Sequence, residues 1–532
     1  MTVSDYIIDF LLQKGVKTVF AYPGANVLRL YARLCESSIR IVLTRHEQGA
    51  IHAAAGYAKA TGKVGVCIAT SGPGAANLIT GIADANLDSS PLLVITGQVP
   101  SRYIGRDAFQ EADILGITIP VTKHNYLVTD AEEVPRDLEE AWRVAESARQ
   151  GPVLVDITSD LFDTALSRRS FEFECLLPRK RENHYPLADS LDKLREVISS
   201  SFRPLVLAGG GVVSSGASQL LRSFCERSGI PCVVTMMGKG LAGAGFENLL
   251  GMAGLHGNIC ANTVLEQCDL LIAIGCRFSD RTVGDFEAFS RSRTIVHCDI
   301  DPAELNKNLK VYLPVCADCS DFLSALSDIA DDLDDTHKER YSGWYTRIPP
   351  VVVSQADELY KSVCRYENEN PGSCIVTDVG TIQTEAARLI TVKGERAFVT
   401  SGGLGAMGFG LPGAIGASFA LYDKDEKGND GRRIILIAGD GGFQMTLQEL
   451  GILSECPLPI KIIIMNNRTL GMVNDMEIGR GGQYLLGDKP DFSLLAKAYG
   501  VPSQRIALDG DSPKKVLDFL SEPESSLLEI IY

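Results

Sequence analysis

The sequence predicts an α/β protein of three doubly wound domains, each a parallel sheet covered by helices. Short apolar runs rich in β-branched residues alternate with amphipathic segments along the whole length of 532 residues. This alternation is typical of parallel strands joined by crossover helices. Two charged stretches without apolar periodicity, at about 166–186 and from about Asp331, divide the chain. We therefore predict domains at 1–165, 187–330 and 350–532, each near the usual size of a domain.

The first part opens on the amphipathic segment MTVSDYIIDFLLQKG, which predicts a helix. Five strand-like runs follow it, each short, apolar and bounded by turn residues. These runs are KTVFAY (17–22), RIVLT (40–44), VGVCIAT (64–70), PLLVITG (91–97) and PVLVDI (152–157).

The second and third parts each contain four runs of the same kind. They are RPLVLAGGG (203–211), PCVVTM (231–236), DLLIAIG (269–275), TIVHCDID (294–301), SCIVTDVG (373–380), RAFVTS (396–401), RRIILIAGDG (432–441) and IKIIIMNN (460–467). In the first and third parts a Gly/Pro loop precedes a small-residue helix, at 71–85 and 408–420. This similarity hints at a duplicated architecture, although chance likeness between α/β units competes with it.

Composition excludes several classes of function. Lys and Arg number 51 against 67 Asp and Glu, a net charge of −16, with no long basic block, so we expect no nucleic-acid partner. No apolar run approaches the ~20 residues that cross a bilayer, so we expect no membrane partner. The 14 cysteines lie mostly singly in apolar runs and are expected to be reduced core residues. With no signal or transit pattern before the first helix, these features predict a cytoplasmic protein.

Glycine is concentrated in clusters between predicted strands and helices, where backbone N–H groups approach anionic ligands. Gly403, Gly405 and Gly408 match the spacing of a dinucleotide fingerprint, and Asp423 lies 20 positions after the first of them. However, Pro412 follows closely and no strand ends at Asp423. A nicotinamide dinucleotide site is therefore the disfavoured alternative.

A stronger pattern lies at the ends of two later strands. Asp440 ends one predicted strand, Asn466 and Asn467 end the next, and a segment with helical periodicity separates them. A right-handed crossover places the carboxyl ends of both strands at the same edge of the sheet. Carboxylate and amide oxygens, with a loop carbonyl and diphosphate oxygens, suit an octahedral Mg²⁺ ion. An Asp after a strand is often only a helix cap, and paired Asn residues are often only a turn, but the combination at this separation is much more specific than either half.

These segments and several others resemble those of a known family. GDGG at 439–442 followed by Asn-Asn at 466–467 resembles the thiamine diphosphate motif. Five further segments are similar to the catalytic subunit of acetohydroxyacid (acetolactate) synthases: 43–98, 104–125, 251–258, 273–284 and 401–417. The resemblance extends from Tyr6 to about Gly500. It implies a pyrimidine-binding domain, a central flavin-type domain and a diphosphate-binding domain.

The resemblance implies a role for each matching residue. Glu47 would hydrogen-bond the pyrimidine N1′ atom of the cofactor, a task that suits a carboxylate in a dry site. Met407 would support the bent cofactor, and Gly405 would accept a hydrogen bond from its 4′-amino group. Gln110, Phe109 and Gly24 would lie at the reacting centre. The other implied cofactor contacts are Asn77, Thr381, Gln383, Gly441 and Gly442, and the implied Mg²⁺ ligands are Asp440, Asn467 and the carbonyl of Thr469.

The middle part resembles the flavin-binding region of the family, where FAD has a structural rather than a redox role. Matching positions are Arg149, Gly209, Gly210, Gly211, Thr235, His256, Arg277, Arg281 and Asp318. Some related enzymes bind no flavin, so a vestigial region is the alternative.

The reaction implied is the decarboxylating ligation of pyruvate to a second 2-keto acid, giving acetolactate or acetohydroxybutyrate for branched-chain amino acid biosynthesis. The protein would orient the substrates and control proton transfer. The resemblance also implies a homodimer or tetramer, and a possible small regulatory subunit.

The chain departs from the family pattern at four places. Met476 replaces a Trp that shapes the pocket for the second keto acid, and Ala25 replaces the second Gly of YPGG. Ser159 replaces a Lys at the site entrance, which is expected to weaken the attraction of carboxylate substrates. Residues 381–383 replace Gln-His-Gln, so a lower cofactor affinity is expected. Two alternatives therefore stay open: a related carboligase or decarboxylase with a different acceptor, and a poorly active or regulatory paralogue.

Overall fold

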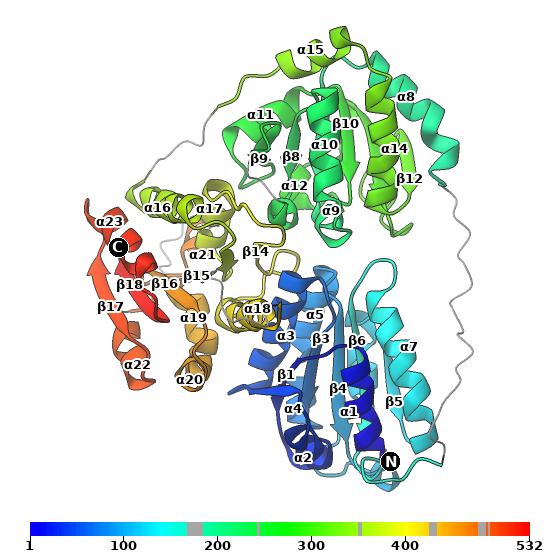
Figure 1. Ribbon diagram of the computed structural model, residues 1–532, viewed down its shortest axis with the longest axis vertical. Helices are drawn as coiled ribbons and strands as arrows, with labels where there is room; N and C mark the ends of the chain where they lie inside the picture. The colour runs from blue at the N-terminus through cyan, green and yellow to red at the C-terminus, as the bar shows by residue number, and fades with distance from the viewer. Residues whose placement is uncertain (168–184, 242–244, 349–353, 425–432, 477–485, 488–489) are drawn as a thin grey trace.

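The protein consists of three α/β lobes, described here from a computed structural model (Figure 1). The structure describes residues 1–532 except 168–184, 242–244, 349–353, 425–432, 477–485 and 488–489. Within this part of the chain there are three six-stranded sheets, and all their strand pairs are parallel. The predicted fold class is confirmed, and each run that we predicted as a strand contains one.

The first sheet has the strand order β2-β1-β3-β4-β6-β5 in the described chain. Its strands are β1 (Thr18–Tyr22), β2 (Arg40–Leu43), β3 (Gly65–Ala69), β4 (Leu92–Gln98), β5 (His124–Val128) and β6 (Pro152–Thr158). Its helices are α1 (Val3–Gln13), α2 (Leu28–Glu36), α3 (Glu47–Thr61), α4 (Pro73–Ala76), α5 (Ile79–Leu87), α6 (Ile114–Thr118) and α7 (Val134–Glu146).

The third sheet has the order β14-β13-β15-β16-β18-β17, which repeats the order of the first sheet strand for strand. The hint of duplicated architecture is thus matched in topology. Its strands are β13 (Cys374–Thr377), β14 (Phe398–Val399), β15 (Ile434–Gly439), β16 (Ile460–Asn466), β17 (Ser503–Ala507) and β18 (Ser526–Ile531). Its helices are α16 (Gln355–Glu369), α17 (Thr381–Leu389), α18 (Gly410–Lys424), α19 (Asp440–Thr446), α20 (Leu450–Glu455), α21 (Gly471–Met476), α22 (Phe492–Ala498) and α23 (Ser512–Ser521).

The central sheet has the order β12-β11-β10-β7-β8-β9. Numbered within this lobe and read from β9, the order is 3-2-1-4-5-6, that of dinucleotide-binding doubly wound sheets. Its strands are β7 (Pro204–Ala208), β8 (Cys232–Val234), β9 (Leu249–Met252), β10 (Leu270–Ile274), β11 (Thr294–Asp299) and β12 (Leu313–Cys316). Its helices are α8 (Leu191–Ser200), α9 (Gly210–Ser214), α10 (Ser218–Ser228), α11 (Ile259–Gln267), α12 (Asp280–Val283), α13 (Phe286–Arg291), α14 (Cys319–Asp331) and α15 (Asp335–Gly343).

One hydrophobic core joins the first and third lobes. It includes Phe20 and Val94 of the first sheet and Val376 and Leu436 of the third, with α3 and α18 contributing between them. Both helices are rich in small residues, and on α3 nearly every face is buried. A helix that is apolar all round belongs in such a doubly covered position. Figure 1 shows α18 lying against α3 where the two lobes meet.

The two helices approach closely because glycines face each other. A Cβ added to Gly416 would lie 1.9 Å from the carbonyl oxygen of Ala53, and one added to Gly56 would lie 2.3 Å from that of Gly413. Real Cβ atoms do not occur at such distances, so any side chain here forces the helix backbones apart. The glycines of α18 therefore set the distance between the two lobes.

Replacing Gly416 with Ala is expected to lower the free energy of unfolding by about 1–3 kcal/mol, the usual cost of overpacking a tight core. The midpoint of urea unfolding measures this. Gly343→Ala is the matched control, because a Cβ there meets no atom within 4 Å. A Gly416→Ala midpoint equal to that of the control would show that the helices tolerate the methyl group.

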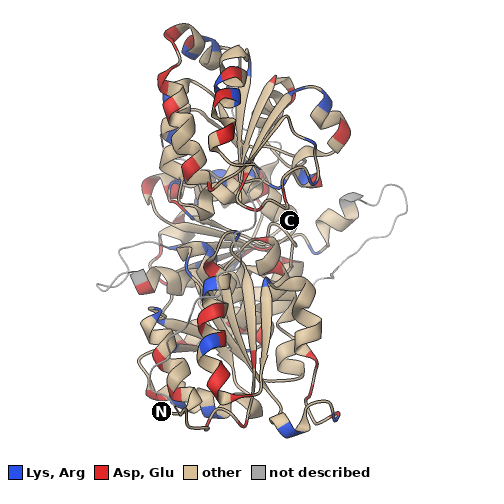
Figure 2. Ribbon diagram, turned by 90° about the vertical axis from the view of Figure 1, so that its right-hand side faces the viewer, with Lys and Arg blue, Asp and Glu red and all other residues tan. Residues whose placement is uncertain are grey.

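Charged side chains of both signs are mixed along the outer helices (Figure 2). No described helix is long and apolar enough to span a membrane.

Candidate functional site

The sequence-predicted residues of the first lobe gather at the carboxyl ends of β1 and β3. From β1 the chain goes to β2 on one side and β3 on the other, and such reversals create the ligand crevice of doubly wound sheets. Gly24 follows β1, and Thr70 follows β3. A Cβ on Gly24 would lie 2.4 Å from Cγ2 of Thr70, so only glycine fits there.

Glu47 is the first residue of α3 and its side chain is buried, with 8% of the residue exposed. Asn77 Nδ2 donates a hydrogen bond to Glu47 Oε2 at 3.0 Å. A Cβ on Gly74 would approach Glu47 Oε1 at 3.2 Å. The predicted residues Glu47 and Asn77 are thus brought together, and the carboxylate is held in one orientation.

Gln110 and Phe109 lie on a loop beside the same crevice. Gln110 has a φ of +61°, an unusual conformation for a residue with a side chain. Its carbonyl oxygen lies 2.7 Å from the position of a Cβ on Gly72, which fixes the loop against the 70–74 turn. Phe109 is 88% exposed. Such an apolar side chain is ready for contact with a substrate or another chain.

A buried hydrogen-bond network anchors the base of this loop. Gln98 Nε2 donates to the carbonyl of Ala112 at 2.9 Å and to Asp156 Oδ2 at 2.8 Å. Burial raises the pKa of Asp156 to about 6. Ser159 donates its backbone N–H to the carbonyl of Gln98 at 3.0 Å, which places it next to the loop base. Ala25 begins the short 3₁₀ turn after Gly24.

In the third lobe, β15 and β16 lie side by side and leave the sheet at the same edge. Gly439 pairs with Met465, so Asp440 and Asn467 follow on adjacent strands, as predicted. A Cβ on Gly471 would lie 3.0 Å from Asn467 Nδ2 and 3.3 Å from Thr381 Oγ1. Thr381 begins α17, so polar side chains converge with a helix N-terminus, an arrangement that suits an anion such as a diphosphate.

The donor set around Asp440 fits a divalent cation. Burial, with a smaller contribution from the charge of Glu529, raises the pKa of Asp440 to about 6, although hydrogen bonds from the backbone N–H groups of Gly441 and Arg468 lower it. A bound cation would reverse this penalty. Asn467 Oδ1 accepts the backbone N–H of Thr469 at 3.1 Å. The described residues contain no cluster of three or more His, Cys, Asp or Glu, and the predicted ligand set has a single carboxylate, that of Asp440.

Gly405 and Met407 lie on the loop between β14 and α18. Gly405 has a φ of +75°, which favours glycine. A Cβ on Gly441 would lie 3.5 Å from the terminal methyl group of Met407, so Met407 packs beside the start of α19. Asp378 holds the far end of this loop, accepting the N–H groups of Gly408 and Gly410, both at 3.0 Å. Gly442 packs directly against Asp378, at 2.5 Å from a built Cβ.

The remaining predicted positions of the third lobe are Gln383 and Met476. Gln383 donates to Thr400 Oγ1 at 2.7 Å and to the carbonyl of Ser401 at 2.8 Å, so its amide group binds the glycine-rich loop. Met476 ends α21, but its side chain lies outside the described residues. The effect of its replacement of Trp therefore stays a prediction.

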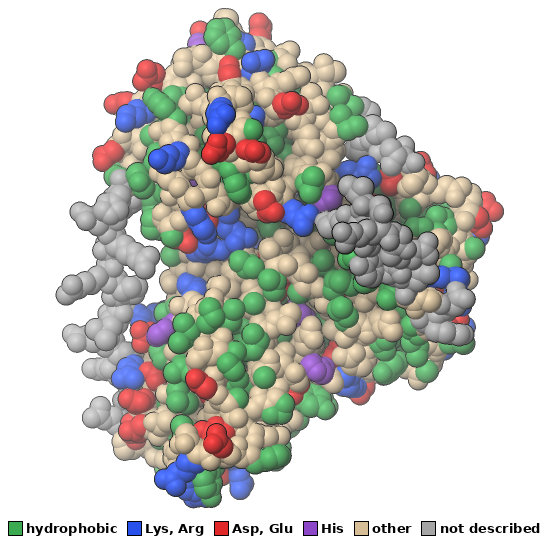
Figure 3. Space-filling model, turned by 180° about the vertical axis from the view of Figure 1, so that it is seen from behind, with side chains coloured by type: hydrophobic (Ala, Val, Ile, Leu, Met, Phe, Trp, Pro, Cys, Tyr) green, Lys and Arg blue, Asp and Glu red, His purple; other side chains and the backbone are tan. Residues whose placement is uncertain are grey.

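A cavity of about 770 Å³ lies where the three lobes meet. Gly210, Gly211, Thr235 and His256 line it from the central lobe, and Arg149 lines it from the first. Arg277, Arg281 and Asp318 of the predicted flavin contacts also lie on its wall, as do Gln383 and Gly405 of the predicted thiamine diphosphate contacts. Figure 3 shows basic side chains gathered in the hollow between the central and first lobes. The predicted Gly209 is absent from the wall: a Cβ on it would lie 2.1 Å from the carbonyl oxygen of Gly275, so it packs against the neighbouring strand end.

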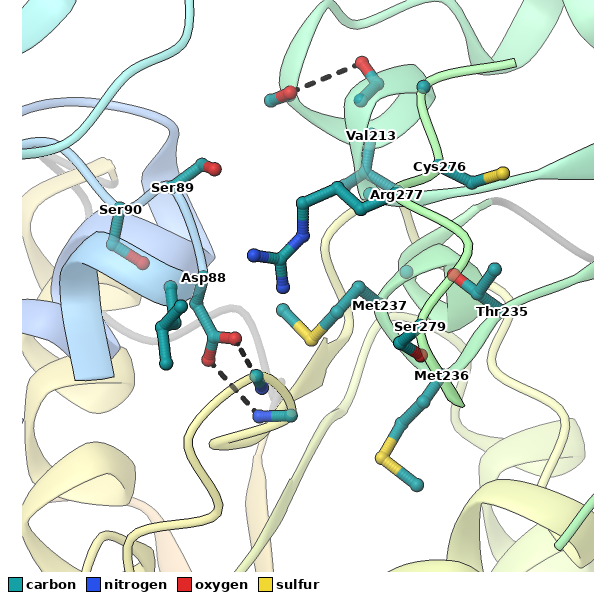
Figure 4. A pocket seen from close by; sticks show the side chains of 18 of the residues that line it. Asp88, Ser89, Ser90, Val213, Thr235, Met236, Met237, Cys276, Arg277 and Ser279 are labelled. Atoms are coloured by element: carbon teal, nitrogen blue, oxygen red, sulfur yellow. Dashed lines mark hydrogen bonds between the residues drawn. The ribbon is translucent and has the colours of Figure 1, made fainter. Parts of the chain in front are cut away.

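The polar groups of the cavity fit an anionic dinucleotide. His256 Nε2 is buried with no hydrogen-bond partner in the described chain. Arg277 extends its guanidinium group into the cavity toward the first lobe (Figure 4). Arg149 is partly engaged, because it pairs with Glu304 at 2.7 Å. An unpartnered ring nitrogen and an extended arginine beside a cavity at the reversal point of the sheet suit a nucleotide ligand.

The sequence reasoning missed several polar residues near the site. Asp378 follows β13 as Asp440 follows β15, so the rule that identified Asp440 also applies to it. Lys59 of α3 forms a buried cluster with Asp84 of α5 and with Asp88, which caps the end of α5, and no sequence spacing connects Lys59 to the two carboxylates. Glu449 is fully buried and accepts the backbone N–H of Arg45 at 3.0 Å, next to the start of α3.

Burial raises the pKa of Glu449 to about 7. An exposed Glu has a pKa of about 4.3, so the folded chain binds a proton that the unfolded chain loses over this range. The contribution that this proton makes to the free energy of unfolding is complete below about pH 4.3 and is lost as the pH rises to about 7. We expect the unfolding free energy of the wild type, relative to Glu449→Gln, to fall over this range by on the order of 3 kcal/mol.

Urea midpoints at several pH values measure this difference. Glu369→Gln is the control, because that side chain is 63% exposed. If the gap between the wild type and Glu449→Gln is independent of pH, Glu449 does not titrate in this window.

Comparison with known proteins agrees with these lobes. Three family models match, described as thiamine pyrophosphate enzyme N-terminal TPP binding domain (residues 1–117), central domain (191–326) and C-terminal TPP binding domain (378–530). The acetolactate synthase isozyme 2 large subunit of Escherichia coli is 41% identical over 95% of this chain and 91% of its own length. The acetolactate synthase large subunit of Lactococcus lactis is 39% identical over 99% and 92%, and the chloroplastic acetolactate synthase of Arabidopsis thaliana is 40% identical over 99% and 81%.

Family models therefore match more than half of the chain, and full-length relatives reach about 40% identity. The chain belongs to the thiamine pyrophosphate enzyme family, among the large subunits of acetolactate synthase.

Proposed function

We propose that this protein is a transferase that uses thiamine diphosphate and Mg²⁺ to join pyruvate, with loss of CO₂, to a second 2-keto acid. The products are acetolactate or acetohydroxybutyrate, and the biological role is branched-chain amino acid biosynthesis in the cytoplasm. Full-length similarity to acetolactate synthase large subunits supports the reaction class. The observation that carries the proposal is the buried Glu47, oriented by Asn77 at the start of α3.

When bound, thiamine diphosphate would supply a nucleophilic carbon for the attack and a thiazolium ring as the electron sink for decarboxylation. Glu47 would hold and release a proton at the pyrimidine ring nitrogen, which a carboxylate in a nearly dry site does efficiently. Asp440, Asn467 and the carbonyl of Thr469 would hold Mg²⁺ against the diphosphate. Met407, packed beside Gly441, would support the middle of the cofactor.

The loop carrying Gln110 and Phe109 would position the reacting carbonyl beside Gly24. Positioning of this kind contributes a large share of the barrier reduction in ligation reactions. The Gln98–Asp156 network holds the loop base in place, which keeps Gln110 close to the 70–74 turn.

The central cavity would hold FAD, with a structural role. Arg277 and Arg281 suit its diphosphate, and the orphaned Nε2 of His256 suits a polar atom of the same ligand. Nothing in this assignment requires electron transfer. We expect the wild-type protein to retain flavin through purification and the Arg277→Ala variant to lose it.

A second copy of the chain would complete the active site, giving a homodimer or tetramer. The described hydrogen bond of Glu47 stays within the first lobe, whereas Asp440 and Met407 belong to the third. Exposed apolar residues beside predicted site residues in sequence support a subunit contact, among them Phe109, Leu404 and Val473. The name "large subunit" of the relatives supports a small regulatory partner.

The test is product identification by mass spectrometry. Purified protein receives thiamine diphosphate, Mg²⁺, FAD and pyruvate, alone and with a panel of 2-keto acids and aldehydes. We expect acetolactate from pyruvate alone. Acetaldehyde as the sole product would instead assign the chain to the simple decarboxylases, and no product with bound cofactor would indicate an inactive paralogue.

Ser159 favours a second candidate, a carboligase with a different acceptor. It lies at the base of the Gln110 loop, where the family pattern has a cation. An entrance with one less positive charge attracts a second carboxylate substrate less strongly. The same panel decides: preferred turnover of a neutral aldehyde acceptor over 2-keto acids would support this candidate.

A further inference from the structure

A buried charge cluster lies between the central cavity and the glycine-rich loop of the third lobe. Lys59 Nζ contacts Asp88 Oδ2 at 2.7 Å and Asp84 Oδ2 at 3.4 Å. The side chain of Lys59 is 9% exposed, and both carboxylates are fully buried. One cation with two carboxylates leaves one negative charge that needs further donors.

The additional donors come from the loop that carries Gly405 and Met407. Asp88 Oδ1 accepts the N–H of Gly403 at 2.6 Å, and Asp88 Oδ2 accepts the N–H of Gly402 at 3.1 Å. Figure 4 shows these two bonds at the edge of the cavity. Hydrogen bonds to a buried carboxylate are stronger than those between neutral groups, so Asp88 is a firm anchor for the loop.

Other contacts keep this loop attached without Asp88. The hydroxyl of Ser401 donates to Asp84, and Lys59 Nζ donates to the carbonyl of Thr400 at 2.8 Å. Gln383 holds the same segment from the opposite side. Removal of the Asp88 carboxylate is therefore expected to loosen residues 402–405 without detaching the loop.

The cavity wall contains both partners of this anchor. Leu87–Ser90 of the first lobe and Gly402–Gly405 of the third lie on it, and Arg277 extends across from the central lobe. A ligand held by the central lobe would therefore contact residues 87–90, which include Asp88, and residues 402–405 of the loop that Asp88 binds. This arrangement connects the cavity to the Gly405–Met407 segment of the thiamine site.

We propose that Asp88 is a positioning residue that couples ligand binding in the central cavity to thiamine diphosphate binding at the 402–407 loop. The inference rests on the proposed function, with FAD as the ligand of the cavity. A ligand in the cavity restricts the motion of residues 87–90. Because Asp88 accepts two hydrogen bonds from the loop, the motion of the loop is restricted as well. Coupling between two binding sites is reciprocal, so each cofactor tightens the binding of the other.

The experiment is a pair of calorimetric titrations of the full chain in the presence of Mg²⁺. Thiamine diphosphate is titrated into flavin-free and into FAD-saturated protein, and the ratio of the two Kd values is the coupling factor. For the wild type we expect a factor on the order of 10, within the usual range for coupled sites. For Asp88→Asn we expect a factor near 1.

Ser89→Ala is the matched control. Ser89 lines the same wall, but its hydroxyl accepts from Arg149 and makes no described contact with the loop. It is expected to retain the wild-type coupling factor. A merely structural role of Asp88 would lower the unfolding midpoint and leave the coupling factor unchanged, and that result overturns the proposal.

The wild-type titrations decide even if Asp88→Asn does not fold. A coupling factor of 1 in the wild type, or no binding of FAD, overturns the proposal while thiamine diphosphate binding stays intact. Absence of thiamine diphosphate binding to the wild type, with or without FAD, instead counts against the proposed function.

Discussion

Replacing Glu47 with Gln is expected to lower kcat for acetolactate formation by about 10²–10⁴-fold, the usual contribution of a positioned proton-transfer group. Gln matches the shape of Glu47 and accepts the hydrogen bond from Asn77, so the start of α3 is expected to stay intact. It cannot hold the proton that a carboxylic acid shares with a ring nitrogen. The variant should therefore bind thiamine diphosphate with near-normal affinity.

Steady-state kinetics and calorimetry separate these two expectations. Glu36→Gln is the control, because Glu36 belongs to the same lobe and its side chain is 68% exposed. Full activity of Glu47→Gln would exclude the proton role. Loss of cofactor binding in parallel with activity would instead make Glu47 a binding residue.

Replacing Asp440 with Asn is expected to raise the Kd for thiamine diphosphate in the presence of Mg²⁺ by about 100-fold or more. Loss of outer-shell partners alone costs metal sites about 10–100-fold, and Asp440 is the charged ligand in the proposed set. The protein without cofactor should not be destabilised, because Asn removes a carboxylate whose ionisation burial opposes.

Thermal unfolding with and without cofactor tests both parts of this expectation. The wild-type midpoint should rise when thiamine diphosphate and Mg²⁺ are added together, and fall back when the metal is chelated. Asp440→Asn should show no such rise. Asp518→Asn, at an exposed position on α23 of the same lobe, should behave as the wild type. A normal Mg²⁺-dependent rise in Asp440→Asn would place the metal elsewhere.

The strands that sequence reasoning identified are mostly the inner strands of each sheet. Inner parallel strands are buried on both faces, so they read as continuous apolar runs. The missed strands β5, β9, β12 and β17 lie at sheet edges, and each is partly exposed. The missed β18 is an inner strand, but Glu529 interrupts its apolar run. This buried carboxylate accepts a hydrogen bond from Asn466. A pairing of that kind is formed only after folding.

The candidate site shows the same division. Asp440 and Asn467 were predictable because parallel strands bring their carboxyl ends to one edge, whatever lies between them in sequence. The hydrogen bonds of Gln383 to Thr400 and Ser401 were not predictable, since a glutamine at a helix start suits a diphosphate equally well.

The sequence by itself determined the fold class, the three lobes and the strand ends where the chemistry lies, because hydrophobic periodicity and crossover handedness are local or topological rules. Only the tertiary structure decided which glycines are cavity walls and which are packing contacts, as Gly210 and Gly209 illustrate. Only the tertiary structure placed Lys59, Asp84 and Asp88 together and in contact with the glycine-rich loop of the third lobe. Buried charges find partners by three-dimensional proximity, and the free energy that selects those partners depends on distance and desolvation, which sequence spacing does not encode.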